Sequence, residues 1–188
     1  SLGCIDSATV TVTEPPLLTA TADSVDVLCF GDSTGSVSVL ALGGVGGYTY
    51  LWSTTDITAT VNNLPAGPYA VTVNDANGCT TTASTSVNQP AAPLTGDLVV
   101  VDNLCFGESF GSIDATINGG VLPYVYSWSN GETTQDIDSI PNGSYALTIT
   151  DANLCVLTLD TLITSPSEVT VYSLKVEPFL PTVSVIRL

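Results

Sequence analysis

The sequence predicts an all-β protein with almost no helix, built from tandem β-sandwich modules. Thr, Val and Ser are abundant and accompany 16 Gly and 11 Pro, a composition typical of short strands joined by tight turns. Apolar and polar residues alternate in short runs, while no segment of ten or more residues has the 3.6-residue apolar period of a helix. One long pattern also occurs twice, which indicates two copies of the same module.

Residues 69–79 are the most informative stretch. Apolar and polar residues alternate up to Asn74, and the turn-forming run Asp75-Ala76-Asn77-Gly78 follows. A second alternating run then occupies residues 81–87. These features predict a β-hairpin at the end of a β-sandwich, and residues 145–155 repeat the first half of it.

The repeat extends far beyond this hairpin. From about residue 17 onward, positions recur without a gap 76 residues later, which predicts one module at 17–91 and a second at 92–167. The matching segments are Cys29-Phe30-Gly31 with Cys105-Phe106-Gly107, Gly43-Gly44 with Gly119-Gly120, Tyr48-x-Tyr50-x-Trp52-Ser53 with Tyr124-x-Tyr126-x-Trp128-Ser129, and Leu64-Pro65-x-Gly67-x-Tyr69 with Ile140-Pro141-x-Gly143-x-Tyr145.

Each copy has about seven short strands, a number and spacing that fit an immunoglobulin-like sandwich. The modules are expected to stack head to tail. Trp52 and Trp128 occupy the place of the core tryptophan of strand C, and Tyr69 and Tyr145 that of the tyrosine corner. An aromatic cage for a ligand is the alternative, and the core interpretation is favoured. In the first copy, strands are predicted near 17–26, 36–42, 48–53, 57–62, 69–74 and 80–88, with one further short strand between them.

The two ends of the chain are predicted to belong to neighbouring modules. Residues 1–16 resemble the C-terminal strand of a preceding repeat, because Gly3-Cys4 matches Gly78-Cys79. Residues 168–188 start a following divergent repeat or a different module, and Pro181 stands where a cysteine is due. Since Ser1 opens in mid-module, any export signal or anchor is expected outside this segment.

The formal net charge of −16, with only 2 Lys and Arg, excludes several function classes. Nucleic acids and anionic lipids attract basic residues, so neither is an expected partner. No apolar run approaches the roughly 20 residues of a membrane-spanning helix. The acidity is interpreted as a source of solubility rather than as a means of concentrating cations.

The combined motifs resemble the SprB-type repeat of very large cell-surface adhesins of Bacteroidota, including the gliding-motility adhesin. They are Cys-Phe-Gly-x-Ser-x-Gly-Ser-Val/Ile, Gly-Gly-x-x-x-Tyr-x-Tyr-x-Trp-Ser and Gly-x-Tyr-x-Val/Leu-Thr-Val/Ile-x-Asp-Ala-Asn-x-Cys. The resemblance implies an extracellular filament at the cell surface, exported by type IX secretion and moved along the cell. Leu154 departs from the pattern where the first copy has Gly78, and the stretch after Pro178 does not follow it.

Three functions are compatible with these features. The leading hypothesis is a structural stalk, whose partners are neighbouring repeats of the same chain and outer-membrane anchoring or motility machinery elsewhere in that chain. The alternative is a polysaccharide-binding module that uses Tyr48, Tyr124 and Phe110. The third is an accessory domain of an enzyme whose catalytic domain lies elsewhere. Catalysis by this segment is not expected, because the chain has no His and its acidic residues recur mostly at turns.

Five cysteines without His or a Cys-x-x-Cys motif predict disulfides rather than a zinc site. Cys29 precedes strand B near the end where the chain leaves a module, and Cys79 follows strand F near the end where it enters. Strands B and F run parallel, so about 20 Å or more separates the two cysteines, whereas a disulfide requires Cα atoms within about 7 Å. Head-to-tail stacking instead brings Cys29 toward Cys155, and we predict this interdomain bond. Cys4, Cys79 and Cys105 would then pair outside this segment.

No cofactor is expected, and calcium is a weak hypothesis. Its candidate ligands are Asp75, Asn77, Asp151 and Asn153, with Asp32 and Glu108 as additional ones. The same spacing is what an Asx turn requires, and this interpretation is favoured.

Glycosylation is a further hypothesis. Asn142-Gly143-Ser144 is an N-glycosylation sequence, and five short motifs resemble the O-glycosylation pattern of Bacteroidota. The candidate residues are Asn142, Ser7, Ser24, Ser33, Ser139 and Thr161.

Overall fold

A computed structural model describes residue 3 and residues 6–171 of the chain. As predicted, the fold is all-β: the described residues form twelve strands and no helix. The strands of the first module are β1 (Thr19–Val25), β2 (Gly35–Leu42), β3 (Thr49–Trp52), β4 (Thr60–Leu64), β5 (Gly67–Asn74) and β6 (Thr80–Val87). Those of the second module are β7 (Thr95–Val101), β8 (Gly111–Asn118), β9 (Val125–Trp128), β10 (Ile137–Ile140), β11 (Gly143–Thr150) and β12 (Val156–Ile163).

Each module consists of two three-stranded antiparallel sheets. In the first module the strand orders are β1-β2-β4 and β3-β5-β6, and in the second they are β7-β8-β10 and β9-β11-β12. In immunoglobulin lettering these sheets are A-B-E and C-F-G, which is the arrangement of an immunoglobulin-like sandwich. The sequence repeat therefore corresponds to a repeat of the whole topology.

Each module has six strands among the described residues, whereas the sequence predicted about seven. No position was predicted for the seventh strand, and the six predicted ranges of the first copy each correspond to an observed strand; residues 53–59, between β3 and β4, form a turn. Here the N–H of Trp52 donates to the Asp56 carbonyl oxygen, and the N–H of Thr55 donates to the Trp52 carbonyl oxygen. The chain thus turns back immediately after β3, which leaves no room for a further strand and delays the start of β4 to Thr60.

The alternating sequence builds a separate core in each module. In β5, Tyr69, Val71 and Val73 are buried, and they pack with Val37 and Trp52. The equivalent core of the second module contains Tyr145, Leu147, Ile149, Ile113 and Trp128. Because alternate strand residues point to opposite faces, each sheet supplies one inner face to the sandwich. Burial of each Val, Leu or Ile side chain stabilises its module by roughly 1.5–3 kcal/mol.

The aromatic residues assigned to the core use their polar atoms within their own modules. The Tyr69 hydroxyl donates to the Pro65 carbonyl oxygen at 2.9 Å, and the Trp52 indole N–H donates to the Thr58 carbonyl oxygen at 2.9 Å. Tyr145 and Trp128 make the corresponding bonds in the second module. All four rings are buried, so they provide no open aromatic cage.

The flanking segments are less regular than the modules. Residues 6–16 form no strand, and Val10 and Val12 are exposed, so the strand matched to a preceding repeat is not formed within this chain. Residues 164–171 also form no strand. The predictions made for Cys4 and for the stretch after Pro178, with Pro181, lie outside the described residues. The proposed domain boundaries at 1–16, 17–91, 92–167 and 168–188 stay predictions.

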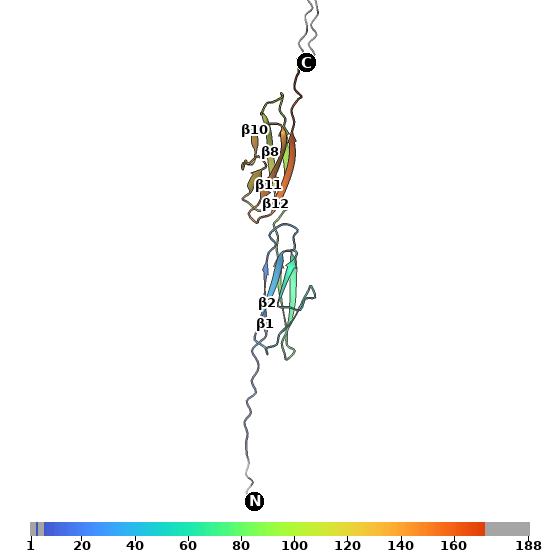
Figure 1. The fold of residues 1–188 in the computed structure, drawn as a ribbon. Helices are drawn as coiled ribbons and strands as arrows, with labels where there is room; N and C mark the ends of the chain where they lie inside the picture. Colours follow the sequence, from blue (N-terminus) through green and yellow to red (C-terminus); the bar gives the residue numbers. More distant parts are fainter. Residues whose placement is uncertain (1–2, 4–5, 172–188) are drawn as a thin grey trace, which may run out of the picture.

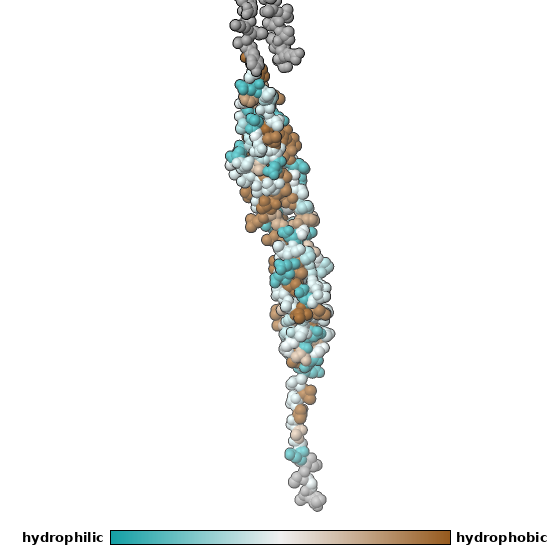
Figure 2. All heavy atoms as spheres, turned by 45° about the vertical axis from the view of Figure 1, so that its right-hand side comes forward, coloured by the Kyte–Doolittle hydropathy of each residue, from teal (hydrophilic) through white to brown (hydrophobic). Residues whose placement is uncertain are grey.

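The described chain is elongated. Figure 1 shows the first and second modules one after the other, with the described segments 6–16 and 164–171 leaving the modules in opposite directions. On the face shown in Figure 2, hydrophobic side chains gather on the second module next to the place where the modules meet. Within the described residues there is no helix of the length and apolarity needed to cross a lipid bilayer.

Candidate functional site at the module junction

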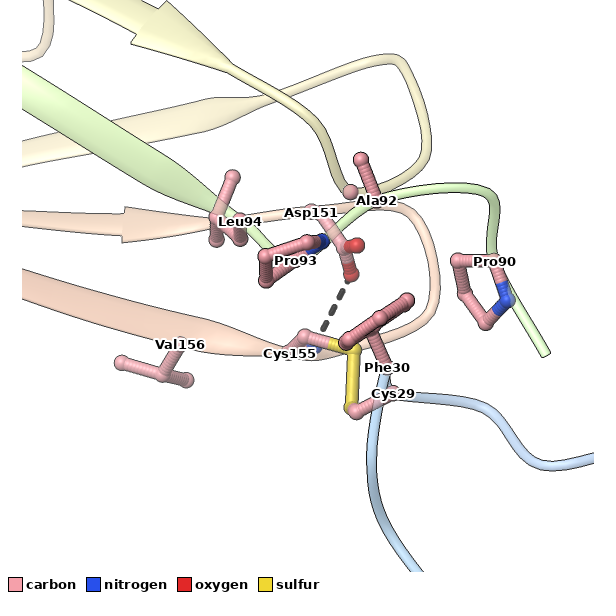
Figure 3. Close-up of a pocket in the computed structure, with 10 residues that line it drawn as sticks. Cys29, Phe30, Pro90, Ala92, Pro93, Leu94, Asp151, Cys155 and Val156 are labelled. Carbon is pink, nitrogen blue, oxygen red and sulfur yellow. Dashed lines mark hydrogen bonds between the residues drawn. A yellow bond between two sulfur atoms is a disulfide. The ribbon is translucent and has the colours of Figure 1, made fainter. Parts of the chain in front are cut away.

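The two modules are joined covalently at the place where they meet. A disulfide links Cys29, in the loop after β1, to Cys155, directly before β12, with a Cα–Cα distance of 5.6 Å. The sequence separation is 126 residues, so the bond connects two different modules (Figure 3). The directions of the strands explain the pairing, because β1 runs toward the junction in the first module and β11 runs toward it in the second.

Further contacts surround the disulfide. The side-chain amide of Asn153 donates to the Leu28 carbonyl oxygen at 2.8 Å, a hydrogen bond between modules. Phe30 lines a cavity of about 170 Å³ together with Pro93 and Leu94, and Figure 3 shows the Phe30 ring beside the disulfide. The junction therefore combines one covalent bond, one hydrogen bond and a small apolar contact. The other residues that line the cavity are Cys29, Pro90, Ala92, Gly120, Asp151, Cys155 and Val156.

A buried carboxylate shapes the loop that carries Cys155. Asp151 is 3% exposed, and its carboxylate accepts the backbone N–H groups of Val121 at 2.9 Å, Asn153 at 2.8 Å and Cys155 at 2.9 Å. The Asp151 side chain thereby fixes the turn that presents Asn153 and Cys155 to the first module. This is the Asx turn favoured by the sequence.

The replacement of glycine by Leu154 leaves this turn unchanged. Leu154 has φ of 66°, close to the 81° of Gly78 at the equivalent position. The left-handed conformation costs a non-glycine residue roughly 1–2 kcal/mol. The hydrogen bonds to Asp151 hold the residues on either side of Leu154 and thus keep the conformation.

The SprB repeat family model matches the chain twice, at residues 21–56 and 98–133. Each match runs from the first strand of a module through the turn after its third strand. Each module thus contains a stretch that is similar to the SprB repeat. No curated protein sequence matches the chain.

Solved structures that are similar to this chain include two that are described by their immunoglobulin domains. They include the N-terminal eight Ig domains of Down Syndrome Cell Adhesion Molecule isoform 1.30.30, at 12% identity and a TM-score of 0.38, covering 79% of this chain and 25% of that chain. DIP-gamma IG1+IG2 has 10% identity and a TM-score of 0.38, and the match covers 83% of this chain and 99% of that chain. Murine CEACAM1b has 13% identity and a TM-score of 0.30, and the match covers 80% of this chain and 100% of that chain. This chain thus spans about a quarter of the first of these structures.

The family model that matches both modules describes a repeat. Together with the immunoglobulin-like fold it suggests a cell-surface adhesin repeat, and the disulfide suggests an extracellular location.

The residues suggested for calcium do not come together as one group in either module. Asp75 accepts backbone N–H groups from Val45 and Asn77, and Asp151 does the same in the second repeat. Asp32 and Glu108 follow the first strand of their repeats, at the end opposite to Asp75 and Asp151. Residue 3 and residues 6–171 contain no group of three or more His, Cys, Asp or Glu that could hold a metal ion. Asn153 instead contacts Leu28 across the junction, a role that the sequence analysis missed and that its position in the repeat did not reveal.

Acid is expected to weaken the first repeat through Asp75. Its pKa lies below the usual value, chiefly because the Val45 N–H donates to the carboxylate. The ionised carboxylate therefore stabilises the fold above the unfolded-state pKa of about 3.9, and this contribution disappears as the pH falls through the folded-state pKa. Asp75→Asn places an NH₂ donor against the Val45 N–H. This variant should have a lower urea midpoint of unfolding than the wild type at pH 7. Below about pH 4 its midpoint should fall less steeply with pH than that of the wild type.

Asp32→Asn is the matched control for this measurement, since Asp32 is exposed in a loop at the other end of the repeat. Its urea midpoint should follow that of the wild type between pH 7 and pH 2.5. If Asp75→Asn and the wild type gave the same pH profile, the stabilising role of the ionised Asp75 would be wrong.

Two more cysteines are exposed at the outer ends of the two modules. Among the described residues, Cys79 and Cys105 are free thiols. Cys79 is the equivalent of Cys155, and Cys105 is the equivalent of Cys29. The described chain thus has one completed junction and one unpaired half of a junction at each end.

The aromatic residues suggested for polysaccharide binding are separated in the structure. The half-buried Tyr48 donates its hydroxyl to the Gly43 carbonyl oxygen at 2.6 Å, and Tyr124 bonds to Gly119 in the same way. Both rings pack on the cores of their own repeats. Phe110 is exposed, but it lies before β8, at the other end of the repeat from Tyr124. These three rings form no common platform.

The glycosylation candidates differ in accessibility. Ser24 is half-buried, and its hydroxyl donates to the Ser86 carbonyl oxygen at 2.9 Å. Thr161 is also half-buried. The exposed candidates are Ser7, Ser33, Ser139 and Asn142, and modification of all six stays a prediction.

Proposed function

We propose that this chain is a tension-bearing stalk segment of a very large secreted cell-surface adhesin that acts in surface adhesion and gliding motility. The observation that carries the proposal is the Cys29–Cys155 bond between neighbouring SprB repeats. A filament of independent domains transmits force through single linkers. Here the disulfide adds a second covalent connection beside the linker and holds the ends of two repeats together.

The repeat architecture supports the same function. Since repeats contact only their neighbours, the reach of such a filament grows with the number of copies. Head-to-tail stacking of the modules is part of this proposal. The net charge of −16 makes neighbouring filaments repel one another, which keeps them apart in solution. The described residues contain no group of three or more His, Cys, Asp or Glu that could hold a metal ion, and Phe110 lies at the other end of its repeat from Tyr124.

The biological setting follows from the resemblance to SprB-type repeats. We infer that the full protein is exported by the type IX secretion system of a member of the Bacteroidota and is anchored to outer-membrane machinery by parts outside this segment. In that setting Cys79 pairs with a preceding repeat and Cys105 with a following one, so that each junction has the disulfide seen between Cys29 and Cys155. The segments 1–16 and 168–188 then belong to these neighbours.

Small-angle X-ray scattering of the oxidised protein tests the stalk proposal. The wild type should scatter as a single elongated body with a narrow range of shapes, because the disulfide limits bending between the repeats. Cys29→Ser should broaden this range, whereas Cys105→Ser, at the equivalent position of the second repeat, should not. Identical scattering by the wild type and Cys29→Ser would remove the observation on which the proposal depends.

A glycan array with the same protein tests the alternative, a polysaccharide-binding module. A stalk segment should bind none of the glycans. Specific binding that is lost in Phe110→Ala would instead support the alternative, because Phe110 is the exposed member of the three aromatic candidates.

A further inference from the structure

The turn that carries Cys155 has the same hydrogen bonds with and without a disulfide. In the second module the carboxylate of Asp151 accepts the backbone N–H of Cys155 at 2.9 Å. In the first module the carboxylate of Asp75 accepts the backbone N–H of Cys79 at 2.8 Å, although Cys79 is a free thiol among the described residues. The carboxylate, and not the sulfur–sulfur bond, therefore holds this turn in shape.

The loop that carries Cys29 is held by its own module. The backbone N–H of Val27 donates to the Asn88 carbonyl oxygen at 2.8 Å. On the other side of Cys29, the backbone N–H of Gly31 donates to the side-chain oxygen of Gln89 at 2.9 Å. Both hydrogen bonds fix the loop to the segment that follows β6, so this loop does not need the second module to keep its shape.

The equivalent loop of the second module forms in the same way around the free thiol of Cys105. The backbone N–H of Asn103 donates to the Thr164 carbonyl oxygen at 3.0 Å, as the equivalent pair does in the first module. The Thr164 N–H in turn donates to the carboxylate of Asp102 at 2.7 Å. Both kinds of cysteine loop at the junction thus occur in this chain without a disulfide as well.

The disulfide between Cys29 and Cys155 is accessible to small molecules. Both side chains are half-buried, and both line the cavity of about 170 Å³ at the junction (Figure 3). A cavity of roughly 150 Å³ can hold a molecule of the size of benzene. A small thiol can therefore reach the sulfur atoms while both modules stay folded.

We propose that the Cys29–Cys155 bond is a redox-sensitive switch, which small thiols reduce and oxidation restores while both modules stay folded. Each hydrophobic core lies within one module, so neither core loses a contact when the bond is reduced. Across the junction there remain the hydrogen bond from Asn153 to Leu28 and a small apolar contact. A typical protein interface has about ten hydrogen bonds, so this contact alone does not hold one module rigidly against the other. The inference rests on the proposed function for its consequence, since reduction then lets the stalk bend.

Reduction is a thiol–disulfide exchange with a small thiol such as glutathione. The glutathione thiolate attacks one of the two sulfur atoms, which forms a mixed disulfide and releases the other cysteine as a thiolate. A second glutathione then attacks the mixed disulfide and releases the remaining cysteine. The two protein cysteines gain two electrons and two protons, and two glutathione molecules are oxidised to one glutathione disulfide. Oxidation of the protein by glutathione disulfide follows the same steps in reverse.

The test uses the whole chain with Cys4→Ser, Cys79→Ser and Cys105→Ser, so that Cys29 and Cys155 are its remaining cysteines. Reduced glutathione is added, samples are trapped with excess iodoacetamide, and the gain in mass gives the rate of reduction. Below the urea midpoint of unfolding, this rate should change less than about twofold with urea. If reduction required unfolding, the rate would rise roughly tenfold per molar urea, because the unfolded fraction depends exponentially on denaturant concentration.

Tryptophan emission shows whether the modules stay folded during reduction. Trp52 and Trp128 are buried, one in each core. Their emission should keep the wavelength of buried tryptophan after reduction, and glutathione disulfide should restore the bond. A steep rise of the reduction rate with urea, or a shift of the emission to that of exposed tryptophan upon reduction, would overturn the inference.

Asp151→Asn tests whether the turn that holds Cys155 favours closure of the bond. The variant should lower the equilibrium constant for oxidation by glutathione disulfide about fivefold, because it weakens the hydrogen bonds that fix this turn. Asp75→Asn is the matched control, since it changes the equivalent turn of the first module, outside the junction. It should leave the constant unchanged. Equal constants for the two variants would contradict the role of the Asp151 turn.

The stalk proposal has a separate readout, the scattering before and after reduction. Reduction that rises steeply with urea, in a protein that is rigid when oxidised, would overturn this inference and leave the proposed function intact. Reduction in the folded state with no change in scattering would do the reverse, because the bond would then not limit bending between the modules.

Discussion

Pulled from its two ends, the oxidised chain should unfold to a length roughly 400 Å shorter than that of the reduced chain. The disulfide closes a loop with a sequence separation of 126 residues, and an extended chain spans about 3.4 Å per residue. Force applied at residues 6 and 171 passes through the disulfide. Only the segments outside the loop, among them β1 and β12, can therefore be stretched to full length.

Single-molecule force spectroscopy with handles at the two ends measures this difference directly. Cys29→Ser should give the long extension without reductant, and Cys105→Ser should behave as the wild type does. Reductant should lengthen the wild type and leave Cys29→Ser unchanged. Equal extensions of the oxidised wild type and Cys29→Ser would mean that the disulfide does not form in solution.

The second large effect is expected for Gly119→Ala, which should destabilise the second repeat by about 3 kcal/mol. Gly119 has φ of 73°, and a Cβ there would overlap the carbonyl oxygen of Pro93. The left-handed conformation costs alanine roughly 1–2 kcal/mol, and displacing the backbone adds roughly 1–3 kcal/mol. Pro93 cannot move freely, because the Gly120 N–H is bonded to the neighbouring Ala92 carbonyl oxygen at 3.1 Å.

Gly107→Ala separates the cost of the left-handed conformation from the cost of displacing the backbone. Gly107 has φ of 76°, but a Cβ there would meet nothing within 4 Å, so this variant should lose only about 1–2 kcal/mol. Hydrogen exchange followed by mass spectrometry measures the opening free energy of each repeat separately. Exchange in β7 to β12 should accelerate strongly in Gly119→Ala and weakly in Gly107→Ala. Equal effects would show that the close approach to Pro93 contributes nothing to stability.

Much of the fold could be predicted because local patterns and long-range packing agree. The alternation in residues 69–74 is the pattern of a strand with one buried face, and β5 buries Tyr69, Val71 and Val73 as that pattern requires. The number of strands in each module was predicted less accurately than their alternation. The early turn after β3 depends on backbone hydrogen bonds of Trp52, which apolar periodicity does not encode.

The candidate site was only partly accessible to sequence reasoning. Strand directions separate the cysteines within a repeat and bring Cys29 near Cys155, so this pair followed from topology. The role of Asn153 did not, because an amide in a turn fits an Asx turn or a calcium ligand equally well until its neighbour is known. Leu154 was also beyond sequence reasoning, since the hydrogen bonds to Asp151, not the local sequence, keep its φ positive.

The position of the disulfide also bears on what proteolysis can do to this protein. A protease that cuts the backbone once anywhere between residues 30 and 154 leaves both fragments attached, because Cys29 and Cys155 enclose the cut. If every junction in an array of such repeats has the same bond, successive loops overlap, since each loop is longer than the repeat of 76 residues. Every peptide bond in the interior of the array then lies inside at least one loop. One nick would therefore leave such an array in one covalent piece.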